Sequence, residues 1–381
     1  MKFLHISDLH IGKNLGNFAL VDEQKHILAQ ITDCVKTEKP SAILIAGDIY
    51  DRAVPSVEAV RIFDDFLTAL ADENIAIMII SGNHDSPERL NYASRLLAER
   101  NISICGTFDG APHKVVLQDE YGDINFWLMP FIKPLSVRNF FKDLQDPDSY
   151  EEAYAAALAA ANIDYSARNV LVAHQFFTGT GFNLERSESE ISIVGGLDAI
   201  NYDLIEKFDY AALGHLHGSQ KVGAGHICYA GSPLKYSFSE CRQKKSLILA
   251  ELKEKGNLEI QKLELLPLHD MREIKGELEE LISEKVASLA DRNDYLRVIL
   301  TDEKEIIDPF GKIRSVYPNA MYLNFENSRS SIDIAEINAD AKKIETLSPY
   351  DLFKEFFLEI QGATMTSEQE KIVRELLEVA D

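Results

Sequence analysis

Five short segments of the sequence carry side-chain types that bind divalent cations. They are Asp8-Leu9-His10, Gly47-Asp48-Ile49-Tyr50-Asp51, Gly82-Asn83-His84-Asp85, Val172-Ala173-His174-Gln175 and Gly214-His215-Leu216-His217. Each follows an apolar run of the kind that predicts a buried β-strand. Open α/β sheets bind ligands beyond the carboxyl ends of their strands. We therefore expect the five segments to meet at one edge of the fold.

These residue types suit the hydrolysis of a phosphate ester. A phosphodiester is anionic and resists attack, and two cations about 3.5–4 Å apart can acidify a water and neutralise the phosphoryl oxygens. Such a pair needs one bridging carboxylate, while neutral His and Asn ligands keep the site from becoming too anionic to admit phosphate. The glycines before Asp48, Asn83 and His215 would permit tight turns and let the backbone approach the substrate.

None of the five segments is specific by itself. Asp-x-His occurs at many solvated strand ends, Gly-Asn-His-Asp can form a capping turn, and a lone histidine such as His174 is more often a core residue than a ligand. Gly-His-x-His is stronger, because alternate residues of a strand face the same side. The five together, in this order, predict a metal centre. The other histidines receive no role: His5, His26, His113, His226 and His269.

The elements that position these segments alternate between strand and helix over the first 105 residues. We expect strands at 3–7, 42–46 and 75–80, and helices at about 22–37, from Pro55 and from Pro87. The helix from Pro55 is expected to present one apolar face: Val57, Val60, Phe63, Leu67 and Leu70. This βαβαβ pattern predicts parallel strands covered by helices.

The pattern changes after residue 110. Strands are expected at 115–117, 125–129, 169–173, 210–213, 227–230, 246–252 and 258–263, with a helix at 150–162 and a long mobile loop at 178–192. Two mixed sheets packed face to face and flanked by helices would account for all of these elements. The expected fold class is therefore α/β with four layers over residues 1–266.

A smaller module is expected beyond Pro267. Residues 267–327 predict a helix at 278–289, a strand at 295–300, a helix near 309–316 and a strand at 321–325. A polar linker follows at 328–347, and two amphipathic helices occupy 348–381. Ser348 with Asp351 resembles a capping box, as does Thr366 with Gln369, and Gly362 ends the first helix.

Composition restricts the function classes. The 381 residues carry a net charge of −23, which argues against a broad, nonspecific grip on a polyanion. The last 116 residues alone hold 25 acidic and 14 basic side chains. If the substrate is a nucleic acid, metals, local basic groups or a partner must supply the attraction. The four cysteines show no C-x-x-C pairing and are expected as reduced thiols. No signal peptide and no apolar run of about 20 residues is present, so we expect a cytoplasmic location.

The motif blocks resemble those of the calcineurin-like metallophosphoesterases. Two further stretches resemble the SbcD family of bacterial nucleases within that superfamily: Met1-Lys2-Phe3-Leu4-His5-Ile6-Ser7-Asp8-Leu9-His10-Ile11-Gly12 and Gly231-Ser232-Pro233-Leu234-Lys235-Tyr236-Ser237-Phe238-Ser239-Glu240. The resemblance implies the four-layer metallophosphoesterase fold with a DNA-capping domain at 267–327. It also implies a manganese-dependent exonuclease and hairpin endonuclease that acts with the SbcC ATPase in DNA repair and recombination, as a homodimer within a heterotetramer.

The resemblance also assigns roles to the motif residues. One cation would be held by Asp8, His10, Asp48 and His217, and the other by Asp48, Asn83, His174 and His215, with Asp48 bridging the two. His84 would protonate or stabilise the leaving alkoxide, with Asp85 orienting it. Asp51 stands where the archaeal and eukaryotic relatives usually carry histidine, whereas the bacterial branch tolerates aspartate there, so its role is open.

Contacts to DNA and to a partner are less sharply defined by the sequence. The basic rim expected to hold DNA consists of Lys13, Arg52, Arg89, Lys235, Arg242, Lys244 and Lys245, although each of them could equally be an ordinary surface group. The terminal helices carry two apolar stripes: Leu352, Phe353, Phe356, Phe357 and Ile360, and Ile372, Val373, Leu376 and Leu377. Periodicity alone fits packing on the chain's own domains, whereas the resemblance implies docking on SbcC.

Two other function classes remain alternatives. One is a phosphatase or phosphodiesterase on the same core that acts on a smaller substrate or on a phosphoprotein; the extra module and the paired terminal helices disfavour it. The other is a scaffold protein with a decayed metal site, since fold does not fix function. The presence of every expected ligand disfavours the scaffold.

Overall fold

The computed structural model describes residues 1–142, 144, 146, 148–179, 181–182, 184–190, 198–327 and 348–378. The chain forms two compact units, Met1–Leu268 and His269–Asp381. The linker expected at 328–347 lies outside the described residues. All four cysteines are free thiols. Within the described part of the chain, none of the helices is both long and apolar enough to cross a membrane.

Two six-stranded sheets build the first unit. The first sheet has the order β16 (Leu258–Glu264), β15 (Ser246–Leu252), β1 (Lys2–Ile6), β4 (Ala42–Ala46), β5 (Ala76–Ile80) and β6 (Ile102–Cys105). The second has the order β13 (Gln220–Val222), β14 (Ile227–Tyr229), β12 (Tyr210–Leu213), β9 (Arg168–Ala173), β8 (Gly122–Met129) and β7 (His113–Asp119). In each sheet four neighbouring strands run parallel, and antiparallel strands complete the edges.

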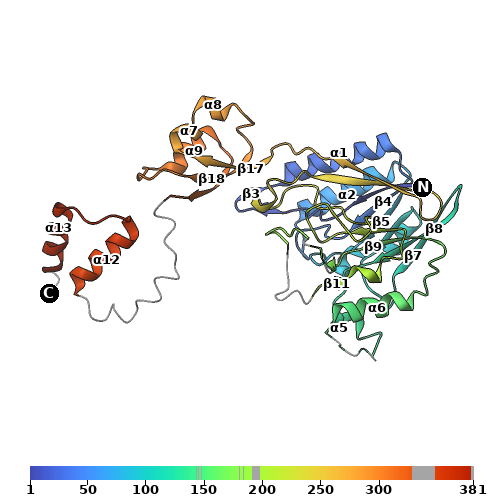
Figure 1. The fold of residues 1–381 in the computed structure, drawn as a ribbon. Helices are drawn as coiled ribbons and strands as arrows, with labels where there is room; N and C mark the ends of the chain where they lie inside the picture. Colours follow the sequence, from blue (N-terminus) through green and yellow to red (C-terminus); the bar gives the residue numbers. More distant parts are fainter. Residues whose placement is uncertain are drawn as a thin grey trace. The chain divides into compact units, whose positions relative to one another are not determined.

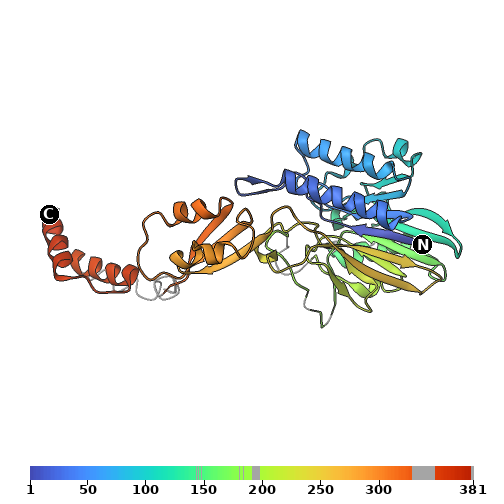
Figure 2. The same cartoon turned by 90° about the horizontal axis from the view of Figure 1, so that it is seen from above.

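Helices cover the outer faces of the two sheets. Figure 1 shows α1 (Val21–Glu38) and α2 (Val57–Ala71) on one side and α6 (Tyr150–Ala160) on the opposite side, and Figure 2 shows the same layers from above. The predicted four-layer α/β architecture is therefore confirmed. Short elements complete the unit: β2 (Asn14–Leu15), β3 (Phe18–Ala19), α3 (Pro87–Leu90), α4 (Ser94–Ala98), α5 (Pro134–Val137), β10 (Phe177–Thr178), β11 (Ile200–Asn201), η2 (Tyr202–Leu204) and η3 (Phe238–Glu240).

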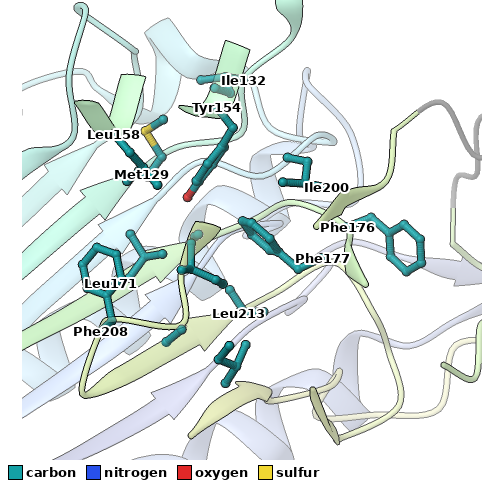
Figure 3. Close-up of a cluster of buried hydrophobic side chains, with 14 of the residues drawn as sticks. Met129, Ile132, Tyr154, Leu158, Leu171, Phe176, Phe177, Ile200, Phe208 and Leu213 are labelled. Atoms are coloured by element: carbon teal, nitrogen blue, oxygen red, sulfur yellow. The ribbon is translucent and has the colours of Figure 1, made fainter. Parts of the chain in front are cut away.

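Two apolar layers lie on the two faces of the second sheet. The layer between the sheets includes Phe3, whose ring meets that of Phe126 edge-on with centroids 5.7 Å apart. The other layer lies between the second sheet and α6, where Tyr154 and Phe177 are completely buried (Figure 3). Burial of such side chains stabilises the fold by about 25 cal/mol per Å² of apolar surface. The two layers fix the sheets relative to each other, and with them the loops at the strand ends.

The second unit contains a three-stranded parallel sheet in the order β17 (Met271–Gly276), β18 (Tyr295–Leu300) and β19 (Ala320–Phe325). The helices α7 (Leu278–Leu281), α8 (Glu284–Ala287) and α9 (Pro309–Val316) share its core. Further along the chain lie α12 (Pro349–Gln361) and α13 (Ser367–Glu378). The Ser348 hydroxyl accepts a hydrogen bond from the Asp351 amide, and Gly362 ends α12 with φ of +63°, as the sequence predicts.

Three predictions about elements are wrong. Helix α2 begins at Val57 after the N-cap Ser56, so Pro55 precedes the helix. Its buried stripe is Ala59, Ile62, Phe63, Phe66 and Leu70, whereas Val57 and Val60 are exposed. The helix expected at 278–289 is two short helices, because Ser283 leaves the helical conformation and caps α8. Strand β17 was not expected. Part of the mobile loop expected at 178–192 lies outside the described residues.

Candidate metal centre

The candidate ligands lie at the carboxyl ends of five parallel strands. Asp8 and His10 follow β1, Asp48 follows β4, and Asn83 follows β5, while His174 follows β9 and the pair His215 and His217 follows β12. The loops after β1 and β4 continue the pairing of their strands: the amides of Asp8 and His10 donate to the carbonyls of Gly47 and Asp48, both at 3.0 Å. The structure thus brings all seven candidate ligands together.

The first donor set contains Asp8, His10, Asp48 and His217. The Nε2 atoms of His10 and His217 face each other at 3.1 Å, and Nε2 of His10 lies 3.7 Å from Oδ2 of Asp48. One ligand atom each of Asp8, His10 and His217 lies within 4.8 Å of the others. Two imidazole nitrogens and two carboxylates aimed at one point form a donor set that suits a divalent transition metal.

The second donor set contains Asp48, Asn83, His174 and His215. The Asn83 side-chain oxygen lies 3.0 Å from Nε2 of His174 and 3.1 Å from Nδ1 of His215. Nε2 of His174 is also 3.3 Å from Oδ2 of Asp48. The same carboxylate oxygen, Oδ2 of Asp48, therefore faces both donor sets. This is the arrangement that a bridging carboxylate between two cations requires.

The protonation of these groups fits a centre that attracts positive charge. Burial holds the pKa of His10 well below its ordinary value and lowers the pKa of His215 to about 3, so both rings are neutral, as metal ligands must be. Burial also disfavours a charged His174, but Asp48 and Asp8 beside it raise its pKa to about 9. The neighbouring His174 and His10 outweigh burial at Asp48 and hold the pKa of its carboxyl well below the usual range. The carboxylates of Asp48 and Asp8 therefore stabilise positive charge at this position.

The backbone around the donor sets is strained. Four candidate ligands adopt positive φ angles, which non-glycine residues rarely do: Asp8 at 54°, His10 at 43°, Asp48 at 51° and His215 at 96°. Strain of this kind costs about 1–3 kcal/mol per residue and gathers at functional sites. Glycine is required beside it, because a Cβ at Gly82 would lie 2.1 Å from Oδ1 of Asp48. Glycine at position 82 therefore leaves room for the Asp48 carboxylate, and approach of the backbone to the substrate stays a prediction.

Both sequence-predicted catalytic residues lie beside Asp48. The His84 amide donates to Oδ1 of Asp48 at 2.8 Å. Nδ1 of the His84 ring lies 3.0 Å from the carbonyl oxygen of Asp51, and its Nε2 is 4.0 Å from Oδ2 of Asp48. The carboxylate of Asp85 accepts hydrogen bonds from three backbone amides, those of Ile49, Tyr50 and Gly82, at 2.9–3.1 Å. The expectation that Asp85 orients the His84 ring directly is therefore wrong, because the Asp51 carbonyl holds the ring and Asp85 ties the loops after β4 and β5 together.

A buried carboxylate behind His217 was missed by the sequence analysis. Glu240 is completely buried, and its Oε1 lies 3.4 Å from Nδ1 of His217. Oε1 also accepts a hydrogen bond from the Ser189 hydroxyl at 2.7 Å, and Oε2 accepts one from Nζ of Lys245 at 2.6 Å. Burial at Glu240 is outweighed by His217 and Lys245, which hold the pKa of its carboxyl well below the usual range. Contacts at Nδ1 leave Nε2 of His217 for the donor set. Glu240 is the last residue of the second stretch that resembles the SbcD family. That resemblance was the only sequence signal that could have pointed to it.

The residues expected to form a basic rim have different environments. Lys245 is buried against Glu240, so the expectation that it contacts DNA is wrong. Nζ of Lys13 lies 2.8 Å from the Asp51 carboxylate, and the Lys235 ammonium donates to the Cys241 carbonyl at 2.8 Å. The other four side chains are exposed: Arg52, Arg89, Arg242 and Lys244. Lys13 and Lys235 therefore already bind oxygen atoms of the chain.

The chain is similar to known proteins over nearly its whole length. A family model described as calcineurin-like phosphoesterase matches residues 1–219, and one described as type 5 capsule protein repressor C-terminal domain matches residues 267–361. A relative from Staphylococcus epidermidis, named as the SbcD component of the nuclease SbcCD, is 33% identical over 327 residues, 85% of each chain. A relative of the same name from Staphylococcus saprophyticus is 31% identical over 381 residues, which are 99% of this chain and 98% of that one.

One weak match is to a solved phosphatase structure. A dimetal phosphatase from Danio rerio aligns over 69% of this chain and 95% of that chain, at 12% identity and a TM-score of 0.38. A likeness of this strength does not bear on the function.

Proposed function

Because the chain belongs to the calcineurin-like phosphoesterases, in the SbcD family of SbcCD nucleases, we propose that it hydrolyses phosphodiester bonds of DNA at a centre of two divalent cations. The observation that carries this proposal is the position of Asp48. Its Oδ2 atom faces His10 of one donor set at 3.7 Å and His174 of the other at 3.3 Å. When bound, the cations supply Lewis acidity to the phosphoryl oxygens and lower the pKa of water.

The residues around Asp48 orient the ligands and move protons. Nδ1 of His174 donates to the carbonyl of Ala46 at 2.7 Å, which leaves Nε2 facing Asn83 and Asp48 of the second donor set. Nδ1 of His84 carries a proton for the same reason, because the Asp51 carbonyl beside it can only accept. The Nε2 atom of His84 is then the one directed to the substrate. We assign to Nε2, which can donate only when both ring nitrogens carry a proton, the hydrogen bond or proton that stabilises the leaving alkoxide.

The proposed substrates are DNA ends and hairpins, and the proposed cation is Mn²⁺. The mixed oxygen and nitrogen ligands suit Mn²⁺, Fe²⁺ or Zn²⁺, and the choice of manganese follows the family. With a net charge of −23, the chain needs the cations and a partner to attract a polyanion. The location in this proposal is the cytoplasm, and the process is DNA repair and recombination.

The partner in this proposal is an SbcC-type ATPase that binds the terminal helices. The apolar stripe of α12 remains open in places: Phe356 is 57% exposed and Ile360 51% exposed, and on α13 Leu376 is 67% exposed. An amphipathic helix of this kind fits the apolar groove of a partner. Residues 267–327 would guide DNA as a capping domain. The assembly would be a homodimer within a heterotetramer.

The test of the proposed function is Asp48→Ala, with Asp64→Ala as the control. Asp64 is an exposed carboxylate on α2, remote in sequence from every candidate ligand. The Asp48 variant should lose both cations, because both donor sets share the missing carboxylate, and it should not cleave hairpin DNA in Mn²⁺. Metal content by mass spectrometry and cleavage on gels measure the two effects. Tight retention of two cations by Asp48→Ala, or cleavage at the rate of the control, would refute the bridging role.

The same assay separates the nuclease from the smaller-substrate alternative. A nuclease of this family cuts hairpin DNA, and the presence of an SbcC-type ATPase with ATP should raise that activity. A chain that hydrolyses only small phosphate esters under all these conditions would favour the alternative.

A further inference from the structure

A cavity of about 310 Å³ opens beside the second donor set. Two of the residues that line it, Asn83 and His215, are proposed cation ligands. The other walls come from the loop after β8, from the first residue of α6 and from the loop after β9, to which Phe131, Tyr150 and Phe176 respectively belong. Its volume lies at the lower end of the range for small-molecule sites, about 300–1,000 Å³.

Aromatic rings form the walls nearest to the donor sets. The ring of Phe131 stands edge-on to His174 with centroids 6.3 Å apart, and Phe176 lies 6.4 Å from His215. In Figure 3 the ring of Phe176 lies at the margin of the apolar cluster, on the side away from Leu171. The guanidinium of Arg186 stacks on Phe176 at 3.7 Å and holds the ring in place. Flat apolar walls suit a planar aromatic ligand.

The polar groups of the cavity suit a neutral ring with hydrogen-bonding edges. The side-chain oxygen of Gln175 accepts from the Ile132 amide at 2.8 Å, which fixes the orientation of the Gln175 amide. Its NH₂ group has no hydrogen-bond partner within the described part of the chain and is available to a ligand carbonyl. The cavity also contains one ammonium, Lys133, and one carboxylate, Asp198. Because these two opposite charges offset each other, the cavity is a poor site for a further phosphate.

We propose that this cavity holds the base and sugar of the nucleotide attached to the scissile phosphate. The phosphate would lie at the donor sets, the base against Phe131 and Phe176, and a base carbonyl would accept from Gln175. This inference rests on the proposed phosphodiesterase function and adds a nucleoside subsite to it. A base must leave its stack to enter such a cavity, which is easiest at a frayed end or an unpaired hairpin loop. The subsite therefore gives a physical reason for preferring those DNA structures.

The first test compares two chromogenic esters in Mn²⁺. Thymidine 5′-(p-nitrophenyl) phosphate carries a nucleoside, whereas methyl p-nitrophenyl phosphate has the same leaving group but neither a base nor a second aromatic ring. Stacking of one base on aromatic side chains predicts that wild type favours the thymidine ester about five- to hundredfold in kcat/KM. Phe131→Ala should bring this ratio toward one, and Phe176→Leu should lower it while preserving most of the apolar packing. Leu135→Ala is the matched control. Leu135 follows Phe131 closely in the sequence, but its side chain is 69% exposed and does not line the cavity.

The second test measures binding without turnover. Calorimetric titration of the Mn²⁺-loaded chain should show that the 5′ or the 3′ monophosphate of thymidine binds about five- to hundredfold more tightly than inorganic phosphate. Phe131→Ala should remove most of that difference with no change in the bound metal. Equal dissociation constants for phosphate and both thymidine monophosphates would overturn the subsite, even if the chain cleaves DNA. Failure of the Mn²⁺-loaded chain to cleave either ester and DNA would instead refute the proposed function, and the titration would still decide whether the cavity binds a nucleoside.

Discussion

Replacing Glu240 by Gln tests whether the buried carboxylate behind His217 supports one of the two cation sites. The change preserves the shape of the side chain and removes its negative charge. In the wild type Oε1 of Glu240 lies 3.4 Å from Nδ1 of His217, and Oε2 lies 2.6 Å from the Lys245 ammonium. Both partners are buried, with Lys245 6% exposed and His217 2% exposed. A single substitution therefore affects a proposed metal ligand and a buried ion pair.

Two magnitudes follow from this geometry. Loss of a carboxylate that supports a metal-binding histidine costs about 10- to 100-fold in metal affinity, or about 1.4–2.7 kcal/mol. Only the donor set that contains His217 should weaken, because the other set has no contact with Glu240. Removal of one partner from a buried ion pair costs about 3–5 kcal/mol of stability. The variant should accordingly unfold at lower urea concentration than the wild type.

A double variant separates the two effects. Glu240→Gln with Lys245→Met removes both charges of the pair, so no buried charge is left without its counter-ion, which is the main cost in the single variant. Stability should therefore recover in the double variant, while the affinity of one cation site stays low. Calorimetric titration with Mn²⁺ resolves the two sites, and urea unfolding measures stability. Glu259→Gln is the matched control: Glu259 lies 2.7 Å from Lys253 but is 64% exposed, so its loss should cost less than about 1 kcal/mol.

Two results would refute this reasoning. The first is Mn²⁺ binding by the folded Glu240→Gln variant with wild-type affinity at both sites. The second is an equal loss at both sites, which would indicate a general disturbance of the fold rather than a defect at His217.

Three further predictions concern single features of the molecule. His84→Ala should keep both cations and bind DNA but lower kcat about 10²- to 10⁴-fold, and near-normal turnover on hairpin DNA would remove His84 from the mechanism. Burial lowers the pKa of His5 to about 3, so below about pH 6.5 the unfolded chain binds a proton that the folded chain does not. Between pH 7 and pH 5, urea unfolding should therefore show that wild type loses about 2 kcal/mol of stability relative to His5→Gln. A stability difference that stays constant over this range would contradict the lowered pKa of His5. Deletion of residues 346–381 should leave Mn²⁺-dependent hydrolysis of simple esters intact and abolish co-purification with an SbcC-type ATPase, whereas persistent co-purification would exclude α12 and α13 as the docking site.

The sequence predicts the position of the candidate ligands well because their signal is local. Each ligand follows an apolar run that forms a strand, and parallel strands deliver their carboxyl ends to one edge. The order of the motifs was therefore enough to predict that Asp8, Asp48 and His215 lie close together in the fold. Glu240 could not be assigned from its segment, because its importance depends on His217 and Lys245, which meet it only in the folded chain. The role of Lys245 was wrong for the same reason, since sequence does not reveal that a lysine is buried in an ion pair.

The errors in helical elements have physical causes of the same kind. Apolar residues recur around α2 at more than one helical phase, and tertiary packing selects the stripe that includes Ile62, Phe66 and Leu70 over the one that begins at Val57. The amphipathic pattern at 278–289 continues through Ser283, whose hydroxyl accepts a hydrogen bond from the Val286 amide and so caps a second helix. Where the signal is a strong cap at a chain turn, as at Ser348 and Gly362, prediction and structure agree.

The most direct test of the central claim is anomalous diffraction at the manganese edge from a crystal grown in excess Mn²⁺. Two peaks should flank the Asp48 carboxylate about 3.5–4 Å apart, one among Asp8, His10 and His217 and the other among Asn83, His174 and His215. A single peak with no second cation beside Asp48, or peaks remote from this carboxylate, would contradict the account.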